Sequence, residues 1–293
     1  MKKTLFVVVA VACAASVVAQ DVPKDTSYWK KSGSSSLTFG QTSFTNWAAG
    51  GNNSVSVLAS FAGKLGYEKD PWMWDNSVDL GYGLSYQGSD QIKNDDHIDL
   101  ATRLGYKASS LWAYAAELNF KSQFYKGYGK YPVEDETKYI SKFMAPGYLI
   151  SSVGVNYTHP REDFKVLLSP MSEKMTFVTD RRLSDEGTYG VDQGKKVFAE
   201  FGALAKATYS KKFTENVLFG TELLLTSAYR TFGNVDMDWR LSLDWKLNKY
   251  FTFKANTYLL YDDDIKFVDK DGTRKGPRVQ FKEVIGLGFG YIF

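Results

Sequence analysis

The sequence of 293 residues carries a formal net charge of +3, is 44% hydrophobic and 16% aromatic, and has a mean hydropathy of -0.30. A charge this small excludes the strongly basic surface of a nucleic-acid-binding protein. Beyond residue 19 there is no run of about 18 apolar residues, which excludes a helical membrane protein. The sequence therefore predicts no nucleic-acid partner and no membrane-spanning helix.

Residues 1–19 are typical of a secretory signal peptide. Lys2 and Lys3 precede an apolar stretch, and small residues lie before the expected cleavage site after Ala19. A lipoprotein signal with Cys13 as the lipidated residue is disfavoured, because the apolar sequence continues beyond that cysteine. Cleavage removes the only cysteine, so the mature chain would be stabilised by backbone pairing and burial without a disulfide.

Residues 20–36 are polar and turn-rich and are predicted to form a periplasmic lead. From residue 37 to residue 293, apolar and polar residues alternate with a period of two, which indicates β-strands. The alternation is unbroken over Val235–Leu247 and nearly as regular over Trp72–Gln87, where aromatic residues lie towards both ends. Aromatic residues at strand ends are typical of membrane-spanning barrels.

Twelve strands are predicted, most of them long enough to cross a bilayer, which takes about 9 to 11 residues. They are 37–45, 54–67, 72–87, 97–109, 112–125, 148–157, 164–169, 196–210, 217–231, 235–247, 250–261 and 278–293. The first and the seventh are short, so ten or fourteen strands remain open alternatives.

The connections alternate between short turns and long loops. The predicted long loops are 88–96, 126–147, 170–195 and 262–277. This asymmetry predicts an all-β, antiparallel outer-membrane β-barrel with long loops extracellular and both termini in the periplasm. The last strand, ending at Phe293, is expected to pair with the first, to face lipid, and to be recognised by the β-barrel assembly machinery.

Several stretches suggest a family. Residues 41–67 and 74–84, with the NWAAGG core at 46–51, resemble an uncharacterised outer-membrane β-barrel family of Bacteroidetes-type bacteria. Residues 145–149 and 167–178 are similar to later blocks of that family. The family is named as a domain of unknown function, so the resemblance implies a fold, an outer-membrane location and a Gram-negative host, but no active site.

The NWAAGG stretch is also the candidate loop or docking site, with Asn46, Trp47, Gly50 and Gly51 as its main residues. It falls in the first outward loop, where glycines permit a tight conformation. It is interpreted either as a loop that enters the lumen or docks a partner, or as a hairpin turn with Trp47 anchored at the interface.

The polar strand faces carry the candidate lumen residues, and their charges are of mixed sign. These candidates are His97, Asp99, Arg103, Glu117, Arg230, Asp236, Asp238 and Arg240. The last four are expected to cluster near the outer mouth, because a short loop joins their strands. A channel selective for one charge usually shows a ring of one sign, so the charges either pair and close the lumen or line a path for small neutral or zwitterionic solutes.

The sequence contains no recognisable catalytic or metal-binding motif. His97 and His159 lie far apart and no nucleophile motif accompanies them, so neither an enzyme nor a zinc site is predicted. The acidic loop Asp262–Asp271 has carboxylates at alternate positions, which can share one calcium ion, but it lacks the EF-hand spacing. Calcium binding by this loop is therefore left open. No cofactor is predicted.

The leading functional prediction is a narrow, non-catalytic channel for small polar solutes. The alternative is a structural or accessory barrel with a closed lumen, belonging to a larger outer-membrane complex. The expected partners are outer-membrane lipid and other outer-membrane proteins. A soluble periplasmic β-sandwich is a third alternative, which extraction without detergent would favour.

Overall fold

The computed structural model describes residues 27–42, 54–87, 90–129, 131–160, 163–265 and 276–292. Four predicted features lie wholly or mostly outside these residues. They are the signal peptide at 1–19, the candidate loop residues Asn46, Trp47, Gly50 and Gly51, the terminal Phe293, and residues 266–271 of the acidic loop.

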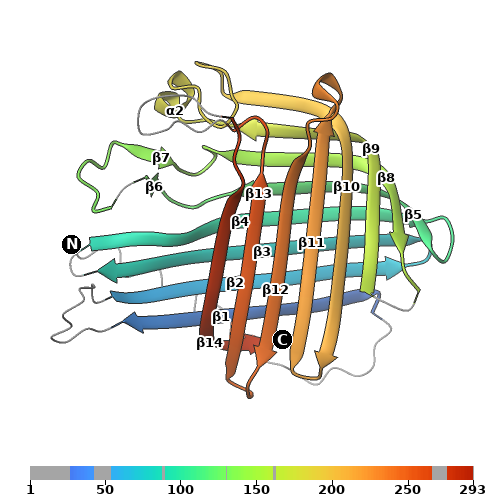
Figure 1. Cartoon of the computed structure of the whole chain (residues 1–293). Coiled ribbons are helices and arrows are strands. Elements are labelled where there is room, and N and C mark those ends of the chain that lie inside the picture. Colours follow the sequence, from blue (N-terminus) through green and yellow to red (C-terminus); the bar gives the residue numbers. More distant parts are fainter. Residues whose placement is uncertain are drawn as a thin grey trace.

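Twelve antiparallel strands close into a barrel (Figure 1). The strands are β1 Trp29–Thr42, β2 Ser54–Lys69, β3 Trp72–Gln87, β4 Asp90–Lys107, β5 Trp112–Ser122, β8 Gly147–Thr158, β9 Asp163–Phe177, β10 Val197–Thr214, β11 Val217–Ala228, β12 Asp236–Lys246, β13 Phe251–Tyr261 and β14 Gln280–Ile292. Pairing of β1 with β14 closes the ring, with Ser36 opposite Gly290. The predicted antiparallel outer-membrane barrel of twelve strands is confirmed.

Figure 1 shows the strands of the front wall crossing those of the back wall, so the strands are tilted against the barrel axis. Two short strands, β6 Gly127–Tyr128 and β7 Tyr139–Ser141, pair outside the barrel in the connection between β5 and β8. In the part of the chain that is described, no helix is long and apolar enough to cross a membrane.

Three strand boundaries differ from the prediction by seven or eight residues. Strand β1 begins at Trp29, so residues 29–36 belong to the barrel wall and not to the predicted lead. The serine-rich sequence of this segment lacks the apolar alternation that indicates a strand. Small polar residues suffice there because they face the lumen, where the Ser36 and Ser60 hydroxyls lie 2.6 Å apart. Strand β4 begins at Asp90, so the predicted long loop 88–96 is mostly strand.

The third difference is β9, which was predicted to end at Ser169 but continues to Phe177. The register shifts against both neighbouring strands at this point, between Val153 and Val155 on β8 and between Gly202 and Leu204 on β10. Such a bulge accommodates Pro170, which has no N–H to donate to the ladder. The strand therefore continues beyond Pro170.

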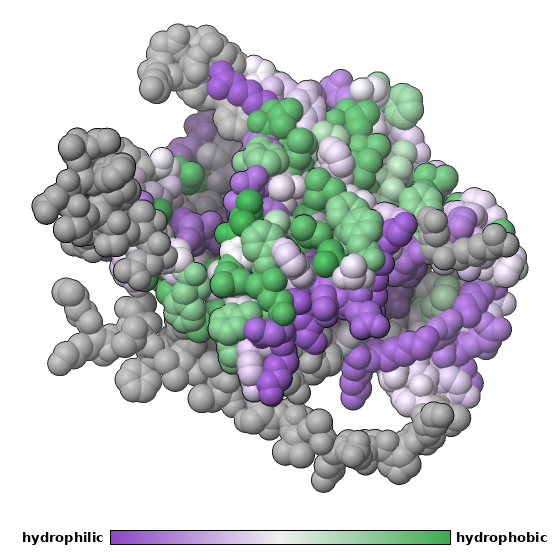
Figure 2. Space-filling model, turned by 60° about the horizontal axis from the view of Figure 1, so that its bottom comes forward, coloured by the Kyte–Doolittle hydropathy of each residue, from purple (hydrophilic) through white to green (hydrophobic). Residues whose placement is uncertain are grey.

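The exterior of the barrel is apolar. Outward-facing side chains such as Leu104, Phe201 and Phe281 are about half exposed, and Figure 2 shows a face with a broad hydrophobic area beside a hydrophilic one. Near the short turns, aromatic rings pair across neighbouring strands, with centroids 5.1 Å apart for Trp72 and Tyr106. Phe201 and Tyr229 make a similar contact at the other end. Two aromatic belts that flank an apolar band are typical of a barrel embedded in lipid.

A cap lies over one end of the barrel, at the upper left of Figure 1. It contains α2, Arg181–Asp185, whose N-cap residue Asp180 accepts a hydrogen bond from the Leu183 N–H. Ala145, Val178, Leu183 and Val191 form its hydrophobic core. The cap is therefore a packed unit, stabilised by burial.

Candidate functional site

The lumen is the candidate site, and alternation of residues along the strands decides what faces it. Strand β4 directs Asp99 inward and β12 directs Asp238 and Arg240 inward, while Leu100 and Trp239 face outward and are exposed. In the ring of twelve strands, β4 and β12 are separated by five strands in either direction, so they lie opposite each other.

Charged side chains from these opposite walls meet in what we call the central cluster: Asp99, Lys121, Asp238, Arg240 and the Tyr258 hydroxyl. Arg240 Nη1 lies 2.7 Å from Asp99 Oδ2, and Arg240 Nε lies 3.3 Å from Asp238 Oδ1. Lys121 Nζ lies 2.5 Å from Asp238 Oδ2, to which Tyr258 also donates a hydrogen bond of 3.0 Å. The cluster contains two positive and two negative groups, and its ion pairs cross the lumen along a diameter.

Further ion pairs lie on both sides of the central cluster. On the side of the cap, Lys174 Nζ lies 2.6 Å from Asp236, 2.8 Å from Asp262 and 3.7 Å from Glu200. Towards the short turns, Lys206 of β10 pairs with Glu117 of β5. The described part of the lumen is thus crossed by ion pairs at more than one level.

The acidic group around Lys174 includes the start of the loop Asp262–Asp271, for which calcium binding was left open. Carboxylate oxygens of Glu200, Asp236 and Asp264 lie within 4.8 Å of one another, a spacing that a cation could bridge. However, the Lys174 ammonium already supplies a positive charge to this group. Burial, followed by the charge of Asp262, raises the pKa of Asp264 in the loop. The Lys174 ammonium therefore offsets part of the repulsion between these carboxylates.

His97 belongs to a third set of charges. Its Nδ1 lies 3.1 Å from Asp95 and its Nε2 lies 3.5 Å from Asp79, while Lys282 of β14 lies 2.6 Å from Asp95. A Cβ at Gly81 would meet the imidazole at 2.3 Å, so the glycine makes room for the ring. His97 is therefore positioned between the carboxylates of Asp79 and Asp95.

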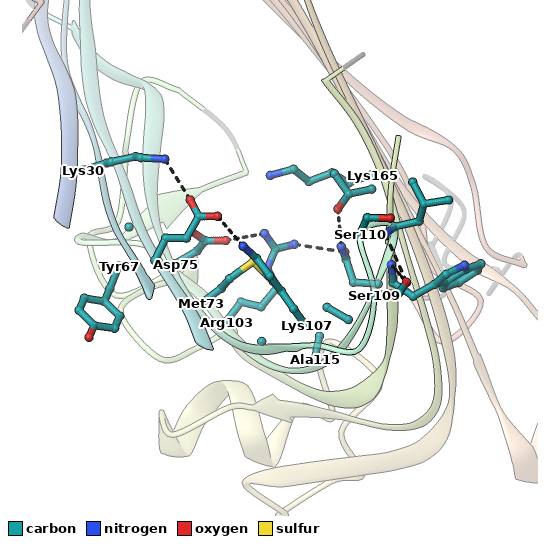
Figure 3. A pocket seen from close by; sticks show the side chains of 18 residues that line it. Lys30, Tyr67, Met73, Asp75, Arg103, Lys107, Ser109, Ser110, Ala115 and Lys165 are labelled. Atoms are coloured by element: carbon teal, nitrogen blue, oxygen red, sulfur yellow. Dashed lines mark hydrogen bonds and ion pairs between the residues drawn. The ribbon is translucent and has the colours of Figure 1, made fainter. Parts of the chain in front are cut away.

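At the end of the short turns, the lumen widens into a cavity of about 380 Å³, which we call the vestibule (Figure 3). Arg103 Nη2 lies 2.6 Å from Asp75 Oδ2, and its Nη1 lies 3.5 Å from the Asn156 side-chain oxygen. Lys30 and Lys107 both bind the Glu68 carboxylate, at 3.0 and 2.9 Å. The vestibule is therefore lined by charged side chains, several of them paired, together with apolar ones.

Most predicted lumen residues do face the lumen, but their partners differ from the prediction. Those that face it are His97, Asp99, Arg103, Glu117, Asp236, Asp238 and Arg240. The expected cluster with Arg230 was wrong: Arg230 lies exposed in the short helix η2, Tyr229–Thr231, because the chain leaves the barrel wall after Ala228. Asp236 contacts Lys174, whereas Asp238 and Arg240 contact side chains of β4 and β5.

Lys174 is the main residue that sequence reasoning missed. It lies within 170–195, which the sequence predicted to be a loop, and in the structure this loop is strand as far as Phe177. The alternation of Ser172, Lys174 and Thr176 with outward-facing residues after the proline was the signal that could have found it.

A closed antiparallel barrel with an apolar exterior and a charged interior defines the class of outer-membrane β-barrels. Residues 39–128 match the model of a family described as "Protein of unknown function (DUF3078)". This match includes the NWAAGG stretch but not the similar blocks at 145–149 and 167–178. No curated protein matches the chain.

Several solved structures are similar in fold. The COG4313 outer membrane channel from Pseudomonas putida F1 has 12% identity and a TM-score of 0.40, covering 94% of this chain and 100% of that one. The translocator domain of autotransporter NalP from Neisseria meningitidis has 11% identity and a TM-score of 0.31, covering 99% and 97%. The P. putida toluene transporter TodX has 9% identity and a TM-score of 0.31, covering 90% and 89%.

Proposed function

We propose that this protein is a non-catalytic, integral outer-membrane barrel whose lumen is closed by its own ion pairs and whose role is structural or accessory to other outer-membrane proteins. The single observation that carries this proposal is the central cluster, in which Arg240 of β12 contacts Asp99 of β4 across the full diameter of the ring. An ion pair that spans the lumen at this level supports a closed barrel.

Other observations support a closed lumen. The cap has an apolar core, and Lys174 joins β9 to Asp236 of β12 and to Asp262 beyond β13. Paired charges of both signs differ from the ladder of one sign that ion-selective pores use.

The outer face supports an accessory role. A groove of about 470 Å³ opens on the outside of the barrel, lined by apolar residues that include Leu118, Val153, Met171 and Phe201. Glu173, on the outward-facing side of β9, also lines this groove. An ionisable side chain facing lipid is costly, so Glu173 is better accommodated by contact with a protein. The predicted orientation, with the short turns and both termini in the periplasm, belongs to the same proposal.

The experiment is single-channel conductance of the full-length protein in a planar bilayer. A closed lumen predicts no conductance steps for the wild type and steps for Asp99→Ala/Arg240→Ala, in which the pair that crosses the diameter is removed. Lys249→Ala, in a short turn outside the lumen, is the matched control and should stay silent. Reproducible steps in the wild type, altered by substitution of Arg240, would refute the closed-lumen proposal.

The second candidate function is a narrow channel for small polar solutes, gated at the central cluster. The vestibule favours it, because a cavity lined by charged side chains at the short-turn end of the barrel has the form of a channel entrance. The two candidates differ in the wild-type conductance, which only the channel hypothesis expects.

A further inference from the structure

We propose that the vestibule is a binding site for a small anion that carries a carboxylate or a phosphate group. The site opens at the short-turn end of the barrel, and its use does not depend on whether the lumen can open further. Lys165 is the principal contact.

The charge of the vestibule is the first argument. Four cationic side chains line it, Lys30, Arg103, Lys107 and Lys165, against the two carboxylates Glu68 and Asp75. Asp70, outside the lining, approaches Lys107 at 3.0 Å but is largely exposed. Even when Asp70 is counted, positive charge is in excess inside a concave, partly desolvated space, where it attracts anions more strongly than on an open surface.

The second argument is that one of these cations has no ion-pair partner among the described residues. Lys30, Arg103 and Lys107 are each paired with carboxylates of the barrel wall. Within the described ranges, by contrast, Lys165 has no hydrogen bond or ion pair, although it is only half-exposed and lines the cavity. A partly buried ammonium without a counter-ion is costly, and an anion in the vestibule would supply one.

The third argument is the arrangement of the cations. Lys165 lies on β9, which is separated from β1, the strand of Lys30, by five strands in either direction. Figure 3 shows Lys165 extending into the cavity from the wall opposite Lys30, with Arg103 and Lys107 pointing in from between them. The cations therefore converge on one space from separate walls.

Neutral groups complete the site. The Asn156 side chain is almost fully buried and donates to the Thr158 hydroxyl at 3.0 Å, and Ser109 and Ser110 also line the cavity. A cavity of about 380 Å³ lies at the lower end of the range for small-molecule sites. The size and the donors fit a small organic acid or phosphate, not a polymer.

The test is calorimetric titration of the folded, full-length protein in detergent with two probes, inorganic phosphate and succinate. We expect saturable binding of at least one probe, with one site per chain, that weakens with added salt. The tighter probe identifies the anionic group. Lys165→Gln should weaken binding about tenfold, the usual worth of one charged hydrogen bond.

Because Lys165 has no partner among the described residues, its substitution should leave the fold intact, which circular dichroism checks. Lys212→Gln is the matched control, since Lys212 is exposed near the same end of the barrel and does not line the vestibule. Absence of saturable binding of both probes at millimolar concentration would overturn the proposal. Equal affinities of the wild type and Lys165→Gln, or an equal loss in Lys212→Gln, would overturn it as well.

Discussion

Replacing Arg240 by methionine tests whether the central cluster stabilises the barrel. Methionine keeps much of the length of the side chain and removes the charge. The substitution removes the contact of 2.7 Å with Asp99 and the contact of 3.3 Å with Asp238. It also removes the guanidinium that lies 5.1 Å from the centre of the Tyr258 ring. Two carboxylates then share the single charge of Lys121.

The expected cost follows from the contacts that remain. Removal of one partner from a buried ion pair destabilises a protein by about 3 to 5 kcal/mol. Asp99 keeps a hydrogen bond of 2.7 Å from Asn119, and Asp238 keeps Lys121 and Tyr258. Because both carboxylates keep a donor, the free energy of unfolding should fall by about 3 kcal/mol, the lower end of that range.

The assay is reversible urea unfolding of the protein in a lipid or detergent environment, followed by tryptophan fluorescence, with midpoints compared at equal slope. The double variant Arg240→Met/Asp99→Leu removes both charges and should be more stable than Arg240→Met alone. Lys254→Met is the matched control, because its pair with Asp244 is longer, at 3.8 Å, and more exposed, so the loss should stay below about 1 kcal/mol. If Arg240→Met lowers the free energy of unfolding by less than about 0.5 kcal/mol, the cluster does not stabilise the barrel. Simple additivity in the double variant would show that Arg240 and Asp99 are not coupled, and would refute the reasoning as well.

The cap and the bulge provide two more predictions. Burial alone would raise the pKa of Asp180, but hydrogen bonds from Lys142 and from neighbouring donors outweigh it and lower the pKa to about 2. Ionised Asp180 therefore stabilises the cap above a pH of about 4 and loses this effect as the pH falls through about 2. Pepsin cleavage within residues 178–196, normalised to an unfolded substrate, should rise severalfold over that interval, and Asp180→Asn should be cleaved readily throughout it. Gly202→Ala should destabilise the barrel by about 3 kcal/mol or more in urea unfolding, because its Cβ would lie 2.1 Å from the Ser227 carbonyl oxygen. Gly220→Ala, whose Cβ meets only a rotatable hydroxyl, should be nearly neutral, and equal losses in both variants would contradict this argument.

The fold could be predicted because the signal is local. Alternation over Val235–Leu247 assigns each residue of the strand to the lumen or to the exterior, and the confirmed strand order follows from sequential hairpins. The missed boundaries lie where that signal fades, in the serine-rich start of β1 and at Pro170. Both have physical explanations: a polar lumen tolerates small polar residues, and a bulge tolerates a proline.

The partners inside the lumen could not be predicted in the same way. Arg240 finds Asp99 because β12 and β4 lie opposite each other once the ring has closed at twelve strands. Ten or fourteen strands, both open from the sequence, would have placed different strands on the diameter. The short loop between β11 and β12 suggested instead that Arg230 would join its sequence neighbours. Closure of the ring, a property of the whole chain, decides these contacts.

In the proposed closed barrel, the cap and the middle of the lumen are held by different chemistry. The cap is held by an apolar core of Ala145, Val178, Leu183 and Val191, whereas the middle of the barrel is held by charges whose desolvation cost nearly offsets their attraction. An apolar core loses stability gradually as methyl groups are removed. In a neutral cluster of four charges, by contrast, removal of one charge leaves another charge buried without a counter-ion. The central cluster is therefore the level at which a single substitution should change the state of the lumen, and conductance should respond there before it responds to changes in the cap.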